Sequence, residues 1–309
     1  TVGCYGPLVS GSNGGSFSRS EDDFSPNVVL TWQPSDDHML YVSYSEGFKG
    51  GGYQLWPVGG GALTDAEIEF EGETAESFEA GGKHTLLAST LQVNWSAWST
   101  EVQGLQVAAF DPVITAQNIV NAGQTTSEGV EGDFIWLPNA SHRISASFAY
   151  TDAIYDSYEG ANCYAGQTPE LGCVGRQQSL TGQSVSYAPE WQYIVSVDGA
   201  YSFAANMEWG WRAAYNWRDD QFIGTQNHPT ADVQEAYGKF NASLFLASAD
   251  GRWRVSLIGT NLNDENVGTG SNHGRMMNLL PERGVTPGIP TIKFMAPGRQ
   301  VAIQGRFNF

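Results

Sequence analysis

The twelve residues SLIGTNLNDENV (256–267) contain the abrupt end of a strand-like pattern. Polar and apolar residues alternate up to Leu262, and a cluster of Asn, Asp and Glu follows. The chain then finishes with GRQVAIQGRFNF (298–309), which alternates again. Alternation with period two predicts extended strands with one apolar face. The reason why this strand ends in a polar cluster therefore indicates whether the sheet is soluble or lies in a membrane.

Period-two alternation dominates the rest of the chain, and the 3.6-residue period of amphipathic helices is scarce. In PEWQYIVSVDGAYSF (189–203), Tyr193 and Val195 share one face, while Gln192 and Ser196 share the other. The same division recurs in TLQVNWSAWS (90–99), NMEWGWRAAYNWRDD (206–220), KFNASLFLAS (239–248) and RWRVSLIGTNL (252–262). These segments predict an all-β protein.

Two features of these runs favour membrane strands over a soluble β-sandwich, whose strands also alternate. The runs exceed the five or six residues usual in globular sheets and fit the roughly nine to eleven that a tilted membrane strand needs. Their apolar faces carry aromatic residues at the ends and smaller residues between, as an aromatic girdle around a hydrocarbon band does. Leu257 then belongs to the lipid band, and Asn261–Asn266 mark the exit into water.

The connections between the predicted strands alternate in length. Short joints are expected at 34–37, 88–90, 138–141, 204–206 and 249–251. Long ones are expected at 50–73, 156–186, 219–236 and 265–297, with one of intermediate length at 111–118. Short periplasmic turns and long extracellular loops are typical of bacterial outer-membrane barrels. A transmembrane antiparallel β-barrel is therefore the predicted fold.

About eleven strands are expected, and residues 1–25 are predicted to form an extracellular loop. Single-chain bacterial barrels have an even number of strands, and an open sheet edge cannot face lipid. We therefore expect either that an N-terminal part, with the first strands, lies outside this chain or that another chain closes the barrel.

Composition excludes several function classes. The chain has 309 residues, 33 acidic and 15 basic, so its net charge is -18. This balance argues against a nucleic-acid partner, which would need a basic face. There is no apolar run of about eighteen residues for a transmembrane helix. The start lacks the pattern of a signal peptide, so we expect a removed signal or a fragment.

Several stretches resemble TonB-dependent outer-membrane receptors, in the order found in that family. Residues 24–53 resemble a strand-turn-strand unit that ends in a Gly-rich loop, and 73–107 and 121–155 resemble the next two hairpins. Residues 238–267 and 296–309 resemble the end of the barrel. The resemblance covers nearly the whole chain from about residue 24 and identifies 1–309 as the C-terminal portion of such a barrel.

The resemblance implies roughly half of a 22-stranded barrel that normally encloses an N-terminal plug. It also implies a receptor that binds a scarce nutrient outside, such as a ferric siderophore, haem, cobalamin or a glycan, and takes it up with energy from the TonB complex. The plug and the TonB-contacting segment are missing from this chain. Outer-membrane lipid and the barrel assembly machinery are further implied partners, with Phe307 and Phe309 as the assembly signal.

Cys163 and Cys173 lie in the Gly/Pro-rich segment NCYAGQTPELGCVG (162–175). Their spacing favours a small disulfide in an oxidising compartment. A zinc pair is the competing hypothesis, although zinc ligands usually lie two to four residues apart and no His lies nearby. Cys4 has no evident partner.

Aromatic residues in the predicted outside loops are candidates for binding an aromatic chelate or stacking on sugar rings. They are Tyr53, Trp56, Tyr158, Tyr164, Phe222 and Met276, the last a thioether rather than an aromatic ring. Loop–loop packing explains them equally well. Two histidines in outside loops, His228 and His273, are added as candidate ligand-binding residues.

Other motifs carry little chemistry. EGFKGGG (46–52) is not followed by the helix with Lys and then Ser or Thr that a phosphate loop needs. The stripe Asp65, Glu67, Glu69, Glu71 and Glu73 could hold Ca²⁺, but a solvated face is preferred. The five histidines, His38, His84, His142, His228 and His273, form no HExxH motif or close pair in the sequence. We expect no metal site, no cofactor, no catalytic residue and no enzyme activity.

Two alternatives remain on the sequence alone. A passive porin would need a constriction lined by charged rings, which no motif indicates. A soluble β-sandwich that binds carbohydrate would alternate in the same way but would not need to sort its loops by length.

Overall fold

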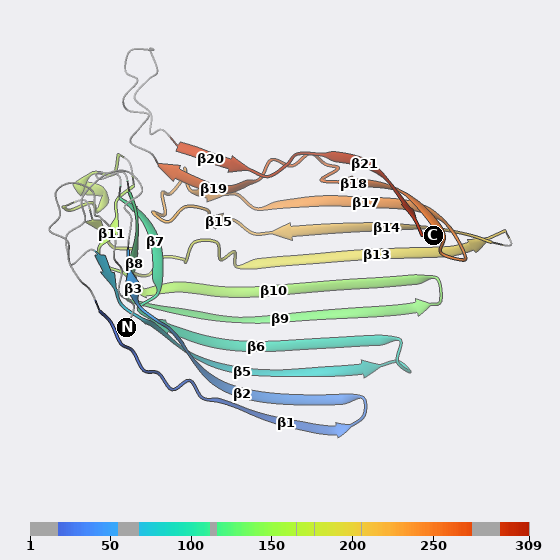
Figure 1. Cartoon of the computed structure of the whole chain (residues 1–309), viewed down its shortest axis with the longest axis horizontal. Coiled ribbons are helices and arrows are strands. Elements are labelled where there is room, and N and C mark those ends of the chain that lie inside the picture. Colours follow the sequence, from blue (N-terminus) through green and yellow to red (C-terminus); the bar gives the residue numbers. More distant parts are fainter. Residues whose placement is uncertain are drawn as a thin grey trace, which may run out of the picture.

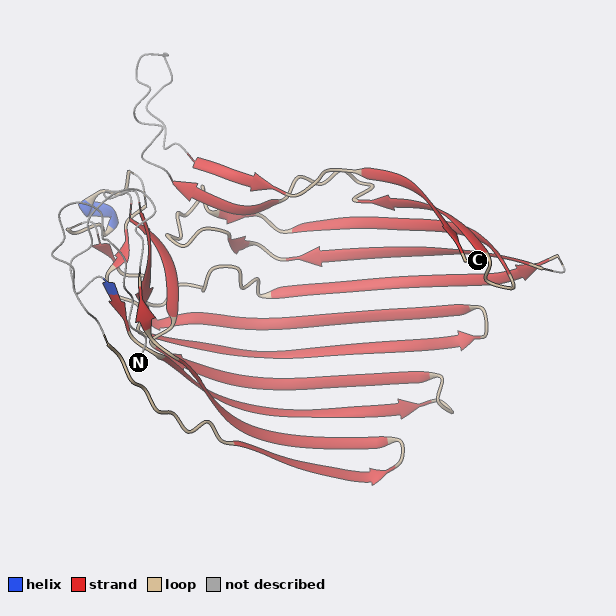
Figure 2. Cartoon of the chain, in the orientation of Figure 1, coloured by secondary structure: helices blue, strands red, loops and turns tan. Residues whose placement is uncertain are grey.

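A computed structural model describes residues 18–54, 68–111, 116–164, 166–175, 177–204, 206–273 and 291–308. Cys4, Trp56, Met276 and Phe309 lie outside these residues. The described part is nearly all β (Figure 2). None of its helices is long and apolar enough to cross a membrane.

One antiparallel sheet of eleven strands forms the body of the protein (Figure 1), which confirms the predicted strand number. Each strand pairs with its neighbours along the chain, in the order β1-β2-β5-β6-β9-β10-β13-β14-β17-β18-β21. The strands are β1 (Asn27–Ser35), β2 (His38–Lys49), β5 (Glu73–Leu86), β6 (Leu91–Gln103), β9 (Gln124–Asn139), β10 (His142–Ser157), β13 (Trp191–Phe203), β14 (Met207–Arg218), β17 (Tyr237–Ser248), β18 (Trp253–Thr260) and β21 (Gln300–Phe307).

The connections follow the predicted sorting, with short turns at one end of the sheet and long loops at the other (Figure 1). In the β17–β18 turn, Gly251 has φ 72°, a conformation that a residue with a Cβ adopts only with strain. The connection predicted as intermediate is longer than expected. It forms a hairpin of β7 (Gln106–Asp111) and β8 (Ala116–Asn121) that lies with the long loops.

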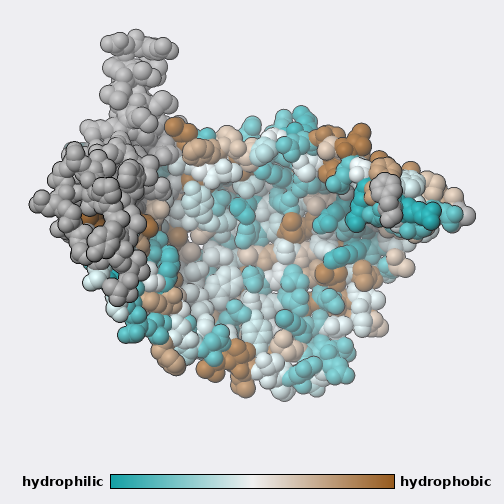
Figure 3. Space-filling model, in the orientation of Figure 1, coloured by the Kyte–Doolittle hydropathy of each residue, from teal (hydrophilic) through white to brown (hydrophobic). Residues whose placement is uncertain are grey.

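Strand register divides the sheet into an apolar and a polar face, because directly paired residues point the same way. Phe148 pairs with Tyr193, and Tyr193 with Trp217, on the apolar face. One position along, Ser147, Ile194 and Asn216 pair on the polar face. In Figure 3 most of the sheet surface turned toward the viewer is teal or white, and brown side chains gather toward its edges.

Aromatic side chains lie at both ends of the apolar face. Near the long loops, Tyr193 stacks on Trp217 with ring centroids 5.2 Å apart. Near the short turns, Tyr201 stacks on Trp209 at 4.9 Å. Between them the strands present smaller apolar residues such as Leu244, which is 54% exposed. This is the girdle-and-band arrangement expected of a sheet whose apolar face meets hydrocarbon.

The polar cluster that ends β18 forms a closed turn. Asn261, 4% exposed, has φ 50° and donates its backbone N–H to Asn241 Oδ1 at 2.8 Å. Its side chain bonds the backbone N–H and carbonyl of Glu265, each at 2.8 Å. Asn263 satisfies Phe240 N–H and Gly238 C=O on the neighbouring strand. The strand therefore ends where side chains take over its backbone hydrogen bonds.

Candidate functional site

The long loops, rather than the sheet, contain the tightly packed interior of the described residues. Tyr158 is 2% exposed and Leu180 0%, and both pack with Tyr155, Ala161 and Ala122. Leu105, Val107, Val120 and Val185 surround this cluster. The β7–β8 hairpin and residues 155–185 thus form one packed unit, which we call the loop cap.

Tyr158 was a candidate for gripping a ligand, but its side chain lies inside the loop cap. Burial raises the pKa of Tyr158, because the phenolate would lose its hydration. Tyr158 therefore packs within the loops, and its buried ring offers no surface to a ligand. A Tyr at the foot of a long loop looks the same in sequence whether it faces in or out.

The disulfide lies at the outer part of the loop cap. Cys163 and Cys173 are joined, with Cα atoms 5.8 Å apart. A single 3-10 turn, η1 (Pro169–Leu171), fills the bridged segment and ends at Gly172 with φ 92°. Leu171, inside the bridged segment, is 60% exposed, and Val174, next to Cys173, is 73% exposed. The bridge therefore fixes an exposed apolar tip on the loop.

The next loop, residues 219–236, is bound to the disulfide-bridged segment. Gln226 donates to the carbonyl of Cys163 at 3.1 Å, and Gln178 donates to the carbonyl of Gln226 at 2.9 Å. The ring of Tyr164 lies against that of His228, with centroids 4.4 Å apart. The structure therefore brings two of the predicted site residues together from separate loops.

His228 is 8% exposed and has a structural role in its loop. Its Nδ1 accepts the backbone N–H groups of Thr230 and Ala231 at 3.2 and 3.1 Å. Asp232, which is 0% exposed, accepts His228 N–H at 2.9 Å and the hydroxyl of Ser271. Ser271 lies on β19 (Gly268–His273), which pairs with β20 (Thr291–Met295). Asp232 thus links two long loops.

The remaining candidates lie apart from this contact. Phe222 is on β15 (Gln221–Phe222), which pairs with β16 (Val233–Gln234) at the base of its loop. Tyr53 is on β3 (Gly52–Tyr53), which pairs with β4 (Glu69–Phe70). His273 ends β19, opposite Thr291. One further loop hairpin, β11 (Ala161–Asn162) with β12 (Gln177–Gln178), contains none of the predicted site residues.

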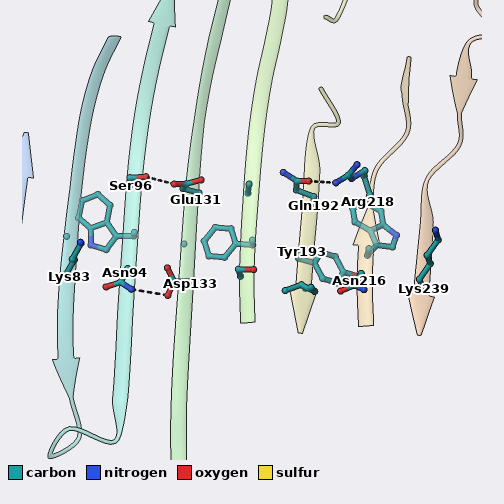
Figure 4. A pocket seen from close by; sticks show the side chains of 18 of the residues that line it. Lys83, Asn94, Ser96, Glu131, Asp133, Gln192, Tyr193, Asn216, Arg218 and Lys239 are labelled. Atoms are coloured by element: carbon teal, nitrogen blue, oxygen red, sulfur yellow. Dashed lines mark hydrogen bonds between the residues drawn. The ribbon is translucent and has the colours of Figure 1, made fainter. Parts of the chain in front are cut away.

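A second candidate region is a hollow of about 740 Å³ on the sheet wall. Polar-face side chains line most of it (Figure 4). Ser96 donates to Glu131 at 3.3 Å, and Asn94 donates to Asp133 at 3.0 Å. Across the hollow, Arg218 donates to Gln192 at 3.1 Å. Glu131 and Asp133 therefore lie toward one side, with Lys83 beyond them, while Arg218 and Lys239 lie toward the other (Figure 4).

Basic residues of the strands are confined to the polar face. By register, each Lys and Arg in the eleven strands points to that side. They are Lys49, Lys83, Arg143, Arg212, Arg218, Lys239, Arg254 and Arg306. Lys and Arg on the apolar face would be costly in hydrocarbon, so this division agrees with the membrane orientation that the pattern predicts.

The acidic stripe is paired rather than arranged as a cation cage. Arg19 forms ion pairs with Glu21, Glu69 and Glu71, and Lys49 with Glu73. The hydrogen bond from Arg19 lowers the pKa of Glu71. Asp65 and Glu67 lie outside the described residues. Sequence reasoning missed Arg19 because fifty residues separate it from the stripe.

One close histidine pair also escaped the sequence. His38 and His84 face each other across β2 and β5, with their Nδ1 atoms 3.0 Å apart. The sequence shows no close histidine pair, but the structure has one, because strand register brings together residues that are far apart in the chain. Within the described ranges, no group of three or more His, Cys, Asp or Glu gathers as metal ligands.

Comparison with known proteins adds the family context. The family model described as "TonB dependent receptor-like, beta-barrel" matches residues 6–262. The pesticin receptor of Yersinia pestis is 23% identical over 155 residues, which are 50% of this chain and 22% of that protein.

Two solved structures share the fold. The ferric yersiniabactin uptake receptor of Yersinia pestis has a TM-score of 0.67 at 18% identity, over 92% of this chain and 37% of that one. The siderophore receptor PiuA of Acinetobacter baumannii has a TM-score of 0.60 at 18% identity, over 90% and 35%. The chain therefore spans well under half of these relatives.

Proposed function

Because this chain belongs to the family of TonB-dependent receptor β-barrels, we propose that it is the C-terminal part of an outer-membrane receptor for a scarce nutrient. Uptake is energised by TonB through a segment outside this chain. The observation that carries the proposal is the two-faced sheet with sorted connections. It has an apolar face with two aromatic girdles, a polar face with the strand cations, and long loops at one end.

Each surface has a different proposed role. The apolar face holds the protein in outer-membrane lipid, and the loop cap meets the external medium. Tyr164 and Phe222, with Tyr53 on β3 and His273 on β19, are proposed to contact the nutrient there. Trp56, which lies outside the described residues, is proposed to join them. His228 positions Tyr164, since His228 is 8% exposed and its ring packs against the Tyr164 ring. The polar face lines the way inward.

A ferric siderophore is the proposed nutrient class. The relatives named above are receptors for pesticin, ferric yersiniabactin and a siderophore. The cationic side of the hollow, with Arg218 and Lys239, suits the oxygen-rich and often anionic surface of a ferric chelate. Haem, cobalamin and glycans are the competing classes, and the same uptake experiment separates them.

The experiment uses the full-length protein in its outer membrane. A strain that depends on this receptor is starved of iron and given radiolabelled iron as a panel of ferric siderophores and as haem, with labelled cobalamin and labelled oligosaccharides in parallel. We expect uptake of one ferric siderophore, lost when TonB is removed. Equal uptake with and without TonB would indicate a passive porin and overturn the proposal.

Membrane location is tested separately. Outer-membrane fractions are washed with salt and then extracted with detergent. We expect extraction by detergent only, and a shift in gel mobility on boiling, as the folded barrel is lost. Release by salt, with no such shift in mobility, would contradict a membrane barrel.

A further inference from the structure

Two imidazole rings meet at the short-turn end of the apolar face. His38 begins β2, and His84 lies directly opposite it near the end of β5. Their ring centroids are 5.2 Å apart and their Nδ1 atoms 3.0 Å apart. Both side chains are half-buried. Each ring therefore aims a nitrogen at the other across two hydrogen-bonded strands, which lie side by side in Figure 1.

Neighbouring residues hold these rings in place. The indole N–H of Trp95, on β6, donates to Nε2 of His84 at 3.2 Å. Gly82 leaves space for the rings of His84 and Trp95. A Cβ at Gly82 would come within 2.7 Å of His84 Nε2 and 2.8 Å of Trp95 Nε1. A side chain there would force His84 or Trp95 to shift, so the glycine is part of the arrangement.

The hydrogen bonds fix where the protons lie. Because His84 Nε2 accepts from Trp95, neutral His84 carries its proton on Nδ1. That proton is donated to Nδ1 of His38, whose own proton is then on Nε2. A single proton thus lies between the two Nδ1 atoms, bonded to that of His84 and accepted by the lone pair of that of His38.

We propose that His38 and His84 form a cross-strand binding site for a divalent transition-metal ion such as Zn²⁺, Cu²⁺ or Ni²⁺, which imidazole nitrogens suit. Zinc–nitrogen bonds are about 2.0–2.1 Å, so two nitrogens on one tetrahedral ion lie roughly 3.3 Å apart. The rings need to separate by only about 0.3 Å to admit the ion. Water completes the coordination.

The proton balance makes a specific demand on Trp95. The ion takes the Nδ1 lone pairs of both rings, and the Nδ1 proton of His84 moves through solvent to its Nε2. A protonated Nε2 can no longer accept from the indole, so the hydrogen bond from Trp95 is given up. Metal binding and the Trp95 bond therefore compete for His84.

Zinc titration of the full-length protein in detergent micelles, followed by calorimetry, tests the site. We expect His38→Gln and His84→Gln each to weaken zinc binding at least about tenfold. His142 is the matched control. It lies near the same end of the same face but bonds Tyr201 at 2.7 Å and Asn139 at 2.9 Å. His142→Gln is expected to leave zinc affinity unchanged.

Trp95→Phe supplies a test that a merely structural histidine pair would not pass. Removing the competing indole N–H is expected to tighten zinc binding about fivefold. Copper loaded into the wild-type protein is expected to show two coordinated nitrogens by electron paramagnetic resonance. Gel mobility before and after boiling checks that each variant is a folded barrel.

Three results would overturn the site. One is zinc affinity that does not differ between the wild type and the folded double variant. Another is an equal loss in His142→Gln. The third is weaker binding in Trp95→Phe. The pair would then be a structural hydrogen bond only. None of these results depends on which nutrient the receptor takes up.

Discussion

The ring of Tyr164 packs against the ring of His228, and this contact joins two long loops that the chain makes separately. Two hydrogen bonds also join these loops: Gln226 donates to the carbonyl of Cys163, and Gln178 donates to the carbonyl of Gln226. The loops that we propose as the binding region are therefore pre-organised by their own packing. Ordering them in advance reduces the entropy that a ligand would otherwise have to overcome.

Leu244→Arg is expected to destabilise the folded barrel in a bilayer by about 2–4 kcal/mol, because Leu244 faces hydrocarbon near the middle of β17. Ser243→Arg, one residue away on the polar face, is the matched control and is expected to change stability little. Denaturant unfolding from lipid vesicles measures both. In water a Leu that is 54% exposed would tolerate Arg, so equal effects would argue against the membrane orientation.

Replacing both Cys163 and Cys173 by Ser is expected to loosen the loop cap and not the sheet. The bridge closes a segment with a sequence separation of 10, for which loss of loop-closure entropy predicts roughly 2.5 kcal/mol. Hydrogen exchange of amides in 158–187 should accelerate, while those of β13 and β14 stay protected. Faster exchange across the whole sheet would contradict a local role.

Tyr158 makes the loop cap sensitive to alkaline pH. Its pKa is raised by burial, so the folded loop holds a neutral phenol while the unfolded loop ionises near pH 10. The stabilisation is complete below about pH 10 and is lost as pH rises through the folded pKa. The phenolate absorbance titration of Tyr158→Phe should lack one late step, although Tyr187 also has a raised pKa. An unchanged late phase would sink this assignment.

Asp232→Asn is expected to weaken the link between the loop 219–236 and β19. Asp232 is 0% exposed and accepts from His228 N–H and Ser271, so an amide NH₂ there would face a donor. A buried polar group left unsatisfied costs about 1–3 kcal/mol. Limited proteolysis should cut within 219–236 more quickly. Asp220→Asn, at an exposed position of the same loop, is the control and should behave as wild type.

Arg19→Ala is expected to release the segment before β1 from the β3–β4 hairpin, since three carboxylates lose their shared partner. Arg19 holds the pKa of Glu71 below its usual range. This contribution is therefore present above the unfolded pKa of Glu71 and is lost as pH falls through the folded pKa. Spin labels at Asp22 should gain mobility in the variant, and in the wild type only on acidification. Arg19→Lys should restore little, because an ammonium lacks the guanidinium fork.

The exact pairing of distant residues shows what the sequence could not provide. His38 and His84 lie 46 residues apart and carry no shared motif. Arg19 is likewise remote from the stripe that it neutralises. Tyr158 and Tyr164 look equivalent as loop aromatics, yet Tyr158 is 2% exposed inside the buried cluster, whereas Tyr164 is half-buried and packs against His228.

The sequence by itself determined the class of fold, the strand number, the division into two faces and the sorting of turns and loops. These properties follow from local chemistry, since side chains alternate across a strand with period two and polar clusters end strands by taking over backbone hydrogen bonds. Only the tertiary structure decided which loop side chains are buried and which imidazoles meet. Register and loop packing depend on the sum of many weak contacts between distant segments, and no short stretch of sequence contains that sum.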